Sequence, residues 1–372
     1  MTNTGTYMRL IIALGFGFAM ALRISSRENT ESKPISIDDS KQRYTQYLPS
    51  CLLIYVAVFS FFYVPLFWGI TDSSEFAVDI FMTYLNIFFH ISIYYALLMI
   101  LLPVMRKHIG AKARAMLWVI PNYLYLIAIN DAMHTEPLVD INISASFAKS
   151  MIFVWLAGFL GILTWKTIEH LSFRRTVLQD AYDVSDSEIL NVWNRVVKSA
   201  GVRKKDYKLV VSPAVNTPVS IGLWNDTIRV VLPEHKYSED ELELVFTHEL
   251  VHICREDAWS KLFIVFCIAM CWFNPLIWIA MKKHAEEIEF SCDETVLANA
   301  GNDIRRKYAN LLLDIAGDER GFTTCLSASA KSLAKRLKEI TKPARRSSGA
   351  IIVAVTFFIL FMTCGLISIQ IS

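Results

Sequence analysis

Two histidines and one glutamate stand within five residues of the sequence, in the order His248-Glu249-Leu250-Val251-His252. Residues four apart on an α-helix share a face, so both imidazoles can reach one metal ion. This spacing is typical of zinc peptidases, in which the ion polarises a peptide carbonyl and the glutamate takes a proton from water. We therefore expect His248 and His252 to bind Zn²⁺, and Glu249 to act as the catalytic general base of a metalloprotease.

The residues around this motif predict the helix that it needs. Ser238 and Glu241 match a capping box, which marks the start of a helix. Apolar residues then recur at helical spacing, namely Leu242, Val245, Phe246, Leu250 and Val251. The competing interpretation makes the histidines ordinary, partly buried residues, although two buried imidazoles would need polar partners in either case.

A catalytic zinc site needs a third protein ligand and an open fourth position. Glu289 is the best downstream candidate, and Asp293 lies one helical turn beyond it. We expect Glu289 to bind the metal and Asp293 to orient a ligating histidine by accepting its other ring N–H. His284 and Cys292 are rival ligands, and a solvated acidic helix face is the simpler explanation of this stretch.

The composition is that of a membrane protein, with 54% hydrophobic and only 19% charged residues. Candidate membrane spans are about 7–22, 48–70, 79–105, 116–131, 143–164 and 349–369. The first and fourth are short, and the fourth contains Pro121. The chain therefore divides into a membrane domain of about five helices at 1–164, a soluble domain at 165–345 and a last helix at 349–369.

The distribution of Lys and Arg orients these spans, because short cytoplasmic connections are enriched in both residues. The first and third connections are basic, whereas the second, at 71–78, and the fourth, at 132–142, contain no Lys or Arg. This alternation puts both termini outside a bacterial cell membrane and the segment 165–345 in the cytoplasm.

The apolar stretch 262–281 is long enough to cross a bilayer, but a crossing would separate the two histidines from Glu289. Zinc ligands must all lie within about 2.2 Å of one ion. Because Asn274-Pro275 interrupts the stretch, we expect a bent helix pair, a re-entrant segment or a buried core element.

The rest of the soluble segment reads as mixed structure. Ser185 and Glu188 predict another capping box, followed by a helix that ends at Gly201. Residues 208–212 and 227–232 are rich in β-formers and predict a small sheet beside the zinc helix. An edge of such a sheet can bind an extended substrate peptide as an added strand.

Three stretches together, 247–253, 272–278 and 289–294, resemble the BlaR/MecR-type membrane metallopeptidases, and 218–222 and 332–338 resemble flanking stretches of the same family. The resemblance covers about 165–345. It implies a multi-pass α-helical membrane protein with a cytoplasmic α+β zinc metalloprotease domain of the gluzincin fold. By position, it gives His248, His252 and Glu289 to the metal, Glu249 to catalysis and Asp293 to support of a ligating histidine.

The same resemblance implies signal transduction in an antibiotic response, by cleavage of a cytoplasmic winged-helix repressor of the BlaI/MecI type and of the protein itself. Family members that sense β-lactams carry an extracellular penicillin-binding domain after the last span. This sequence ends at residue 372, so we expect no direct acylation by a β-lactam. Self-cleavage is expected in the flexible stretch 317–330, with Arg305-Arg306 and Arg345-Arg346 as alternatives.

Other features limit the possible functions. A net charge of +2 and the lack of any DNA-reading motif argue against direct nucleic-acid binding. Seven cysteines, mostly in membrane or cytoplasmic segments, indicate reduced thiols. The expected partners are a peptide or protein substrate and membrane lipid. The sequence is compatible with either a monomer or a homo-oligomer. The alternative functions are a quality-control gluzincin protease and a catalytically silent membrane receptor.

Overall fold

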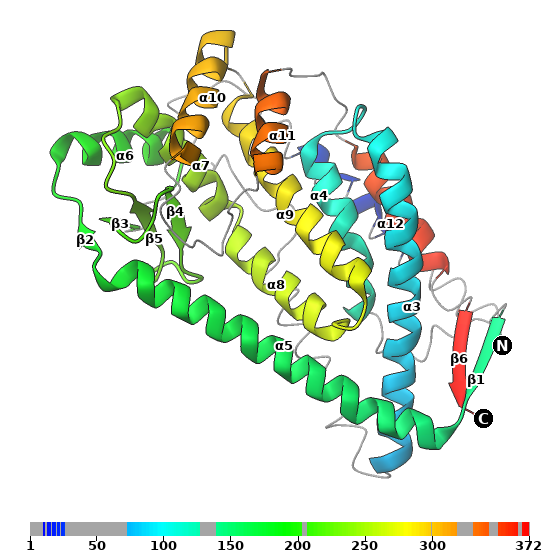
Figure 1. The fold of residues 1–372 in the computed structure, drawn as a ribbon. Coiled ribbons are helices and arrows are strands. Elements are labelled where there is room, and N and C mark those ends of the chain that lie inside the picture. The colour runs from blue at the N-terminus through cyan, green and yellow to red at the C-terminus, as the bar shows by residue number, and fades with distance from the viewer. Residues whose placement is uncertain are drawn as a thin grey trace.

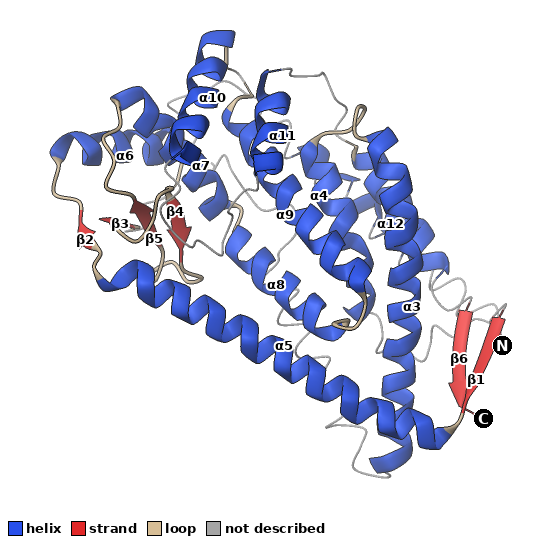
Figure 2. Ribbon diagram, viewed as in Figure 1, coloured by secondary structure: helices blue, strands red, loops and turns tan. Residues whose placement is uncertain are grey.

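The computed structural model of the protein describes residues 10–26 in part, 73–126, 139–202, 207–298, 300–317, 330–341, 349–363 and 367–371. These residues form a mostly helical structure with one small sheet and a separate pair of strands (Figures 1 and 2). The helices form a bundle at one end of the molecule, and the small sheet lies at the other end. The motif His248–His252 lies between them.

Four described elements make up most of the bundle: α3 (Ser73–Met105), α4 (Ala111–Val119), α5 (Ala145–Gln179) and α12 (Ala350–Thr363). Two stretches are long and apolar enough to cross a membrane, Tyr84–Met105 in α3 and Ser150–Gln179 in α5. Only 11% of the apolar window of α5 is buried inside the protein. A continuous exposed apolar face of this kind indicates contact with lipid or with a partner.

The structure changes several of the predicted spans. The span 79–105 lies inside α3, which begins at Ser73, so residues 73–78 of the expected second connection are helical. The span 143–164 begins just before α5, and this helix runs unbroken through residue 164, the expected end of the membrane domain. The span 48–70 lies outside the described residues.

The span 116–131 does not form one α-helix in its described part. Helix α4 ends at Val119, and a 3₁₀ helix, η1 (Ile120–Leu126), follows it. Pro121 accounts for the change, because proline has no backbone N–H and its ring crowds the preceding helical turn. The last predicted span is also shorter than expected, since α12 covers 14 residues and a strand begins at residue 367.

The apolar stretch 262–281 forms a helical hairpin, in agreement with the predicted bent helix pair. Its arms are α8 (Asp257–Met270) and α9 (Pro275–Val296), and Asn274 caps α9 by accepting a hydrogen bond from the Leu276 N–H. Helix α8 packs along α5, and α9 packs along α4 (Figure 1). The hairpin therefore enters the bundle and returns to the side from which it started.

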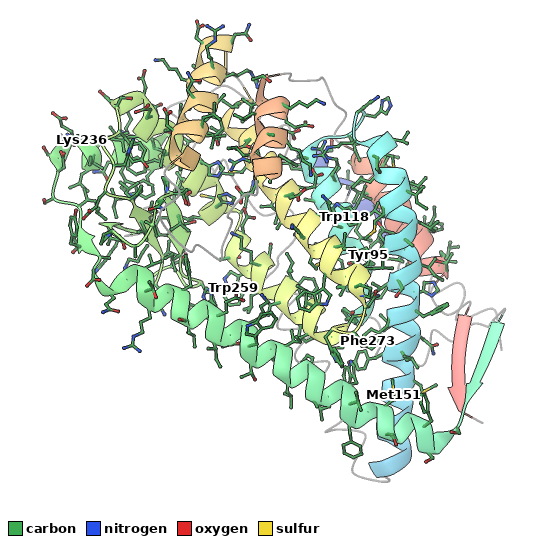
Figure 3. All side chains as sticks on the ribbon, viewed as in Figure 1. Tyr95, Trp118, Met151, Lys236, Trp259 and Phe273 are labelled. Atoms are coloured by element: carbon green, nitrogen blue, oxygen red, sulfur yellow. The ribbon has the colours of Figure 1, made fainter. Side chains whose placement is uncertain are left out.

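The interface between hairpin and bundle is aromatic and tightly packed. Phe266 of α8 packs edge-on against Phe159 of α5 at 6.2 Å between ring centroids. Phe273 at the hairpin tip packs edge-on against Phe88 of α3 at 5.4 Å (Figure 3). The indole N–H of Trp155 on α5 donates to the carbonyl oxygen of Met270 at 2.8 Å. One hydrophobic core thus joins the hairpin to the helices of the bundle.

The small sheet has the strand order β2-β3-β5-β4. Strands β3 (Lys208–Val211) and β5 (Arg229–Leu232) pair in parallel and lie within the two predicted β-rich runs. The flanking strands are β2 (Tyr182–Asp183), which pairs antiparallel with β3, and β4 (Val219–Ile221), which pairs antiparallel with β5. Both strands are too short to be predicted from the sequence. Strand β4 therefore forms one edge of the sheet, on the side nearest the zinc-motif helix.

Helix α7 (Glu239–Cys254) carries the zinc motif and begins at the predicted capping box of Ser238 and Glu241. Helix α6 (Ser187–Ser199) packs beside it and ends before Gly201, as predicted, but Asp186 caps it instead of Ser185. The Asp186 carboxylate accepts a hydrogen bond from the Glu188 N–H, which Ser185 stands one residue too early to do.

Four further elements belong to the described structure. Helices α10 (Asn302–Gly317) and α11 (Ala330–Thr341) pack against each other, and both contact helices of the zinc-motif region. Strands β1 (Val139–Ile143) and β6 (Ile367–Ile371) pair in parallel. This pairing brings the end of the fourth connection next to the C-terminal residues, which the predicted topology places on the same side of the membrane.

Candidate metal centre

Helices α7 and α9 bring the three predicted metal ligands to one point. The Nε2 atoms of His248 and His252 lie 3.1 Å apart. One oxygen of the Glu289 carboxylate lies 3.6 Å from Nε2 of His248, and the other lies 3.7 Å from Nε2 of His252. The side chains are only 10% to 13% exposed, so the site is enclosed.

These separations fit a metal ion. Ligand atoms about 2.0–2.2 Å from a tetrahedral zinc ion lie about 3.3–3.6 Å from one another. The three separations of 3.1, 3.6 and 3.7 Å lie within about 0.2 Å of this range. Two imidazoles and one carboxylate are also a donor set of catalytic zinc sites, which leave a fourth position for water or substrate. The chain therefore has a geometry and a set of donor atoms that suit zinc.

Glu249 lies between the two histidines on α7 and is 6% exposed. The opposite face of the helix fixes this orientation, because Phe246, Leu250 and Val251 are fully buried in the core. Trp193 of α6 packs edge-on against Phe246 at 5.2 Å between ring centroids. Burial of the apolar face of α7 thus directs His248, Glu249 and His252 toward α9.

His252 is held by a carboxylate from the neighbouring helix. Its Nδ1 lies 2.6 Å from an oxygen of Asp257, the first residue of α8. The chain turns sharply between α7 and α8 at Glu256, which has a left-handed backbone with a φ of 54°. An Nδ1–H bonded to Asp257 leaves the Nε2 lone pair free for a metal.

His248 is held through a longer chain of groups. Its Nδ1 lies 2.9 Å from the hydroxyl of Tyr308 on α10, and that hydroxyl donates to Asp293 at 2.7 Å. Asp293 itself lies 3.6 Å from Nδ1, which is too far for the direct hydrogen bond that we predicted. Asp293 therefore contacts the histidine through the tyrosine, and it also pairs with Arg336 of α11.

The two rival ligands differ in their placement. His284 binds the carbonyl oxygen of Ala115 through Nδ1, at 2.8 Å, at the interface of α9 with α4. Cys292 is closer, because it forms a group with His248 and His252 whose possible ligand atoms lie within 4.8 Å of one another. Its Sγ, however, lies 3.3 Å from Nδ1 of His248, whereas the Glu289 oxygens face the Nε2 pair. We therefore favour Glu289.

Comparison with known proteins identifies the family of this chain. The family described as BlaR1 peptidase M56 matches residues 131–340, which are more than half of the chain. The chain belongs to this family. The resemblance to BlaR/MecR-type proteins that the sequence predicts is thus confirmed, and peptidase is the coarse functional class.

Individual relatives of this M56 family member are distant. Regulatory protein BlaR1 of Bacillus licheniformis is 25% identical over 208 residues, which are 56% of this chain and 33% of that protein. The methicillin resistance mecR1 proteins of Staphylococcus aureus (strain Mu50 / ATCC 700699) and Staphylococcus epidermidis are 27% identical over 114 residues, 30% of this chain and 19% of theirs. The matched part thus spans a third or less of these relatives.

Negative groups dominate the metal centre of this M56 chain. Burial by itself raises the pKa of Glu289, but His252 and His248 outweigh burial and hold this pKa well below its ordinary value. Burial by itself lowers the pKa of His248, whereas Cys292 and Glu289 raise it, to about 10. The site thus stabilises positive charge, and a metal ion must compete with protons for the histidines.

Three residues of the M56 site are missed by sequence reasoning: Asp257, Tyr308 and Arg336. Asp257 stands five residues after His252, so an acidic residue just beyond the motif was an available signal. Arg336 lies in the stretch 332–338, which carries part of the family resemblance but no ligand motif. Tyr308 has no local signal, because only the packing of α10 brings it to the site.

Proposed function

We propose that this chain is a zinc-dependent membrane endopeptidase that transmits a signal by cleaving a cytoplasmic protein. The convergence of two imidazole Nε2 atoms and one carboxylate beside Glu249 carries the proposal. Membership in the M56 family supports the peptidase class.

Each residue has a defined role in this proposal. His248, His252 and Glu289 hold zinc, which supplies polarisation of a peptide carbonyl and a lowered water pKa when it is bound. Glu249 takes a proton from the attacking water and delivers it to the leaving amine. Asp257 holds His252 in the tautomer whose Nε2 faces the metal.

The sheet supports binding of an extended substrate. Strand β4 lies at the edge of the sheet and contacts α7, the helix of the zinc motif. The outer backbone groups of an edge strand can pair with a peptide, which then runs past the catalytic helix. An open cavity of about 350 Å³ at the N-terminal end of α7, lined in part by Glu234, Tyr237 and Asp314, offers further room beside this path.

The proposed substrate is a winged-helix repressor of the BlaI/MecI type. The relatives support it by their names, which denote a regulatory protein and methicillin resistance proteins. Self-cleavage between residues 317 and 330 is a second proposed reaction. Only the ends of this stretch lie within the described residues, at Gly317 of α10 and Ala330 of α11.

The proposed membrane topology puts the metal centre in the cytoplasm. In support, the basic connection between α3 and α4 lies at the same end of the bundle as α11 and the start of α12 (Figure 1). The hairpin of α8 and α9 keeps all three proposed ligands on one side, because both of its open ends lie at the metal centre.

Glu249→Gln tests the proposal, since the amide keeps the shape of the side chain but accepts no proton. We expect peptide cleavage by the purified full-length protein to fall by about 10²- to 10⁴-fold, the usual contribution of a general base. Bound zinc, measured by atomic emission, should stay at one ion per chain. Glu243→Gln is the matched control, because Glu243 lies on the same helix with 56% of its side chain exposed.

Two outcomes would contradict the proposed enzyme. Cleavage at the wild-type rate by Glu249→Gln would remove Glu249 from catalysis. A wild-type protein that binds no zinc and cleaves neither itself nor a repressor would favour a silent receptor. Cleavage of many unrelated membrane proteins would instead favour a quality-control protease with the same site.

A further inference from the structure

Helix α11 contributes one side chain to the metal centre. Arg336 donates two nearly parallel hydrogen bonds to Asp293, from Nε to Oδ2 at 2.8 Å and from Nη2 to Oδ1 at 2.7 Å. Its third nitrogen lies 3.7 Å from an oxygen of Glu289. The side chains of Arg336 and Asp293 are only 12% and 4% exposed. A paired fork of this kind fixes the carboxylate in orientation as well as in charge.

Asp293 in turn fixes the next two groups. A tyrosine hydroxyl has a single hydrogen, and that of Tyr308 points to Asp293. The Tyr308 oxygen can therefore only accept a hydrogen from Nδ1 of His248. With its proton on Nδ1, His248 presents the Nε2 lone pair to the metal position.

We propose that Arg336 is a positioning residue for the metal centre, because it holds Asp293 and Tyr308 in the arrangement that aims His248 at the metal. The guanidinium acts on His248 through Asp293 and Tyr308, and its third nitrogen also lies 3.7 Å from the carboxylate of Glu289. This inference rests on the proposed function, since it assumes that His248 is a zinc ligand.

The docking of α11 does not depend on Arg336 alone. Ile340 is 3% exposed, and Leu337 packs against the same core. Lys335 makes a separate ion pair with Glu286 of α9 at 3.1 Å, with 31% of its side chain exposed. A change at position 336 can therefore disturb the metal centre while the helix stays in place.

The test compares Arg336→Gln with Lys335→Gln in the full-length protein. Zinc affinity is measured by competition with a chelating indicator, and peptide cleavage gives kcat and KM. We expect Arg336→Gln to weaken zinc binding by about 10- to 100-fold, as loss of support for a ligand does, and to lower kcat more than it changes KM. Lys335→Gln should change zinc affinity by less than about twofold, because an ion pair that is partly open to solvent contributes little.

A second set of variants guards against simple misfolding, since Arg336→Gln leaves a buried carboxylate without its cation. Asp293→Asn and the double variant Arg336→Gln/Asp293→Asn complete a cycle, and limited proteolysis reports whether α11 stays docked. If Arg336 acts through Asp293, the double variant should bind zinc no more weakly than Asp293→Asn alone.

Two results would overturn the role of Arg336. One is equal zinc affinity in Arg336→Gln and Lys335→Gln, and the other is full additivity in the cycle. Both require a wild-type protein that binds zinc and cleaves peptide, so they leave the proposed function standing. A wild-type protein without zinc would instead remove the proposed function.

Discussion

The two sides of the metal centre are supported in different ways. His252 bonds Asp257, which lies only five residues further along the chain, at the corner between α7 and α8. His248, one turn earlier on α7, depends on a relay that begins at Tyr308 and passes through α10, α9 and α11. The first support forms with a local corner of the chain, whereas the second needs three distant helices to dock.

This difference shows where the helices of the bundle can influence the site. Arg114 of α4 is fully buried and bonds Glu287 of α9 at 2.7 Å, two residues before Glu289. Arg106, in the connection between α3 and α4, pairs with the same carboxylate at 3.2 Å. The bundle thus holds α9, which carries Glu289 and Asp293, through ion pairs to Glu287. His252 is held separately by Asp257, at the corner between α7 and α8.

The largest expected effect tests which residue of α9 completes the metal centre. Glu289→Ala should weaken zinc binding by more than about 100-fold, beyond the loss that follows removal of a supporting residue. Cys292→Ala should cost less, because its thiol faces Nδ1 of His248, and His284→Ala should cost least. Competition with a chelating indicator gives all three affinities.

The same three variants could refute the assignment of the ligands. If Cys292→Ala lost zinc while Glu289→Ala kept it, the third ligand would be the thiol, and the Nε2-centred geometry would be wrong. If His284→Ala lost the most, α9 would have to rotate away from α4 to bind the metal.

The next effect compares the two supports directly. Asp257→Asn should weaken zinc binding by about 10- to 100-fold, because it removes the charge that polarises His252. Tyr308→Phe should cost about tenfold or less, since it removes an uncharged hydrogen-bond partner of His248, whereas Asp257 is a carboxylate. A larger loss for Tyr308→Phe, measured in the same titration, would mean that the long-range support is the stronger one.

Local features were the ones that the sequence could predict. The motif helix, its capping box at Ser238 and the break at Asn274-Pro275 all follow from residues a few positions apart, and the structure has each of them. Strands β2 and β4 were missed because runs of two and three residues show no alternation.

Features set by packing were beyond sequence reasoning. The direct hydrogen bond predicted between Asp293 and a histidine is replaced by a bridge through Tyr308. Tyr308 stands 60 residues after His248 in the chain, and only the packing of α10 brings it to the site. The continuous helix through residue 164 also has no local signal, since apolar residues give way to charged ones without a helix breaker.

The smallest expected effect concerns the hairpin tip, far from either support. Gly158 of α5 lies against Trp272, and a Cβ at this position would come within 2.0 Å of the indole ring. Gly158→Ala should therefore lower the free energy of unfolding by about 1–3 kcal/mol, as overpacking usually does, and lower the thermal midpoint of the detergent-solubilised protein. Gly161→Ala is the matched control on the same helix, because nothing lies within 4 Å of its added Cβ.

The zinc affinity of Gly158→Ala then shows whether a change in the packing of the bundle affects the supports of His248 and His252. Both arms of the hairpin reach the metal centre, since α8 begins at Asp257 and α9 carries Glu289. The hydrogen bond of Asp257 lies at the far end of α8 from the tip, so we expect an unchanged affinity and a changed midpoint. A parallel loss of affinity in Gly158→Ala, with none in Gly161→Ala, would show instead that the hairpin moves as one rigid body. The local support of His252 would then depend on the packing of the bundle as much as the relay to His248 does.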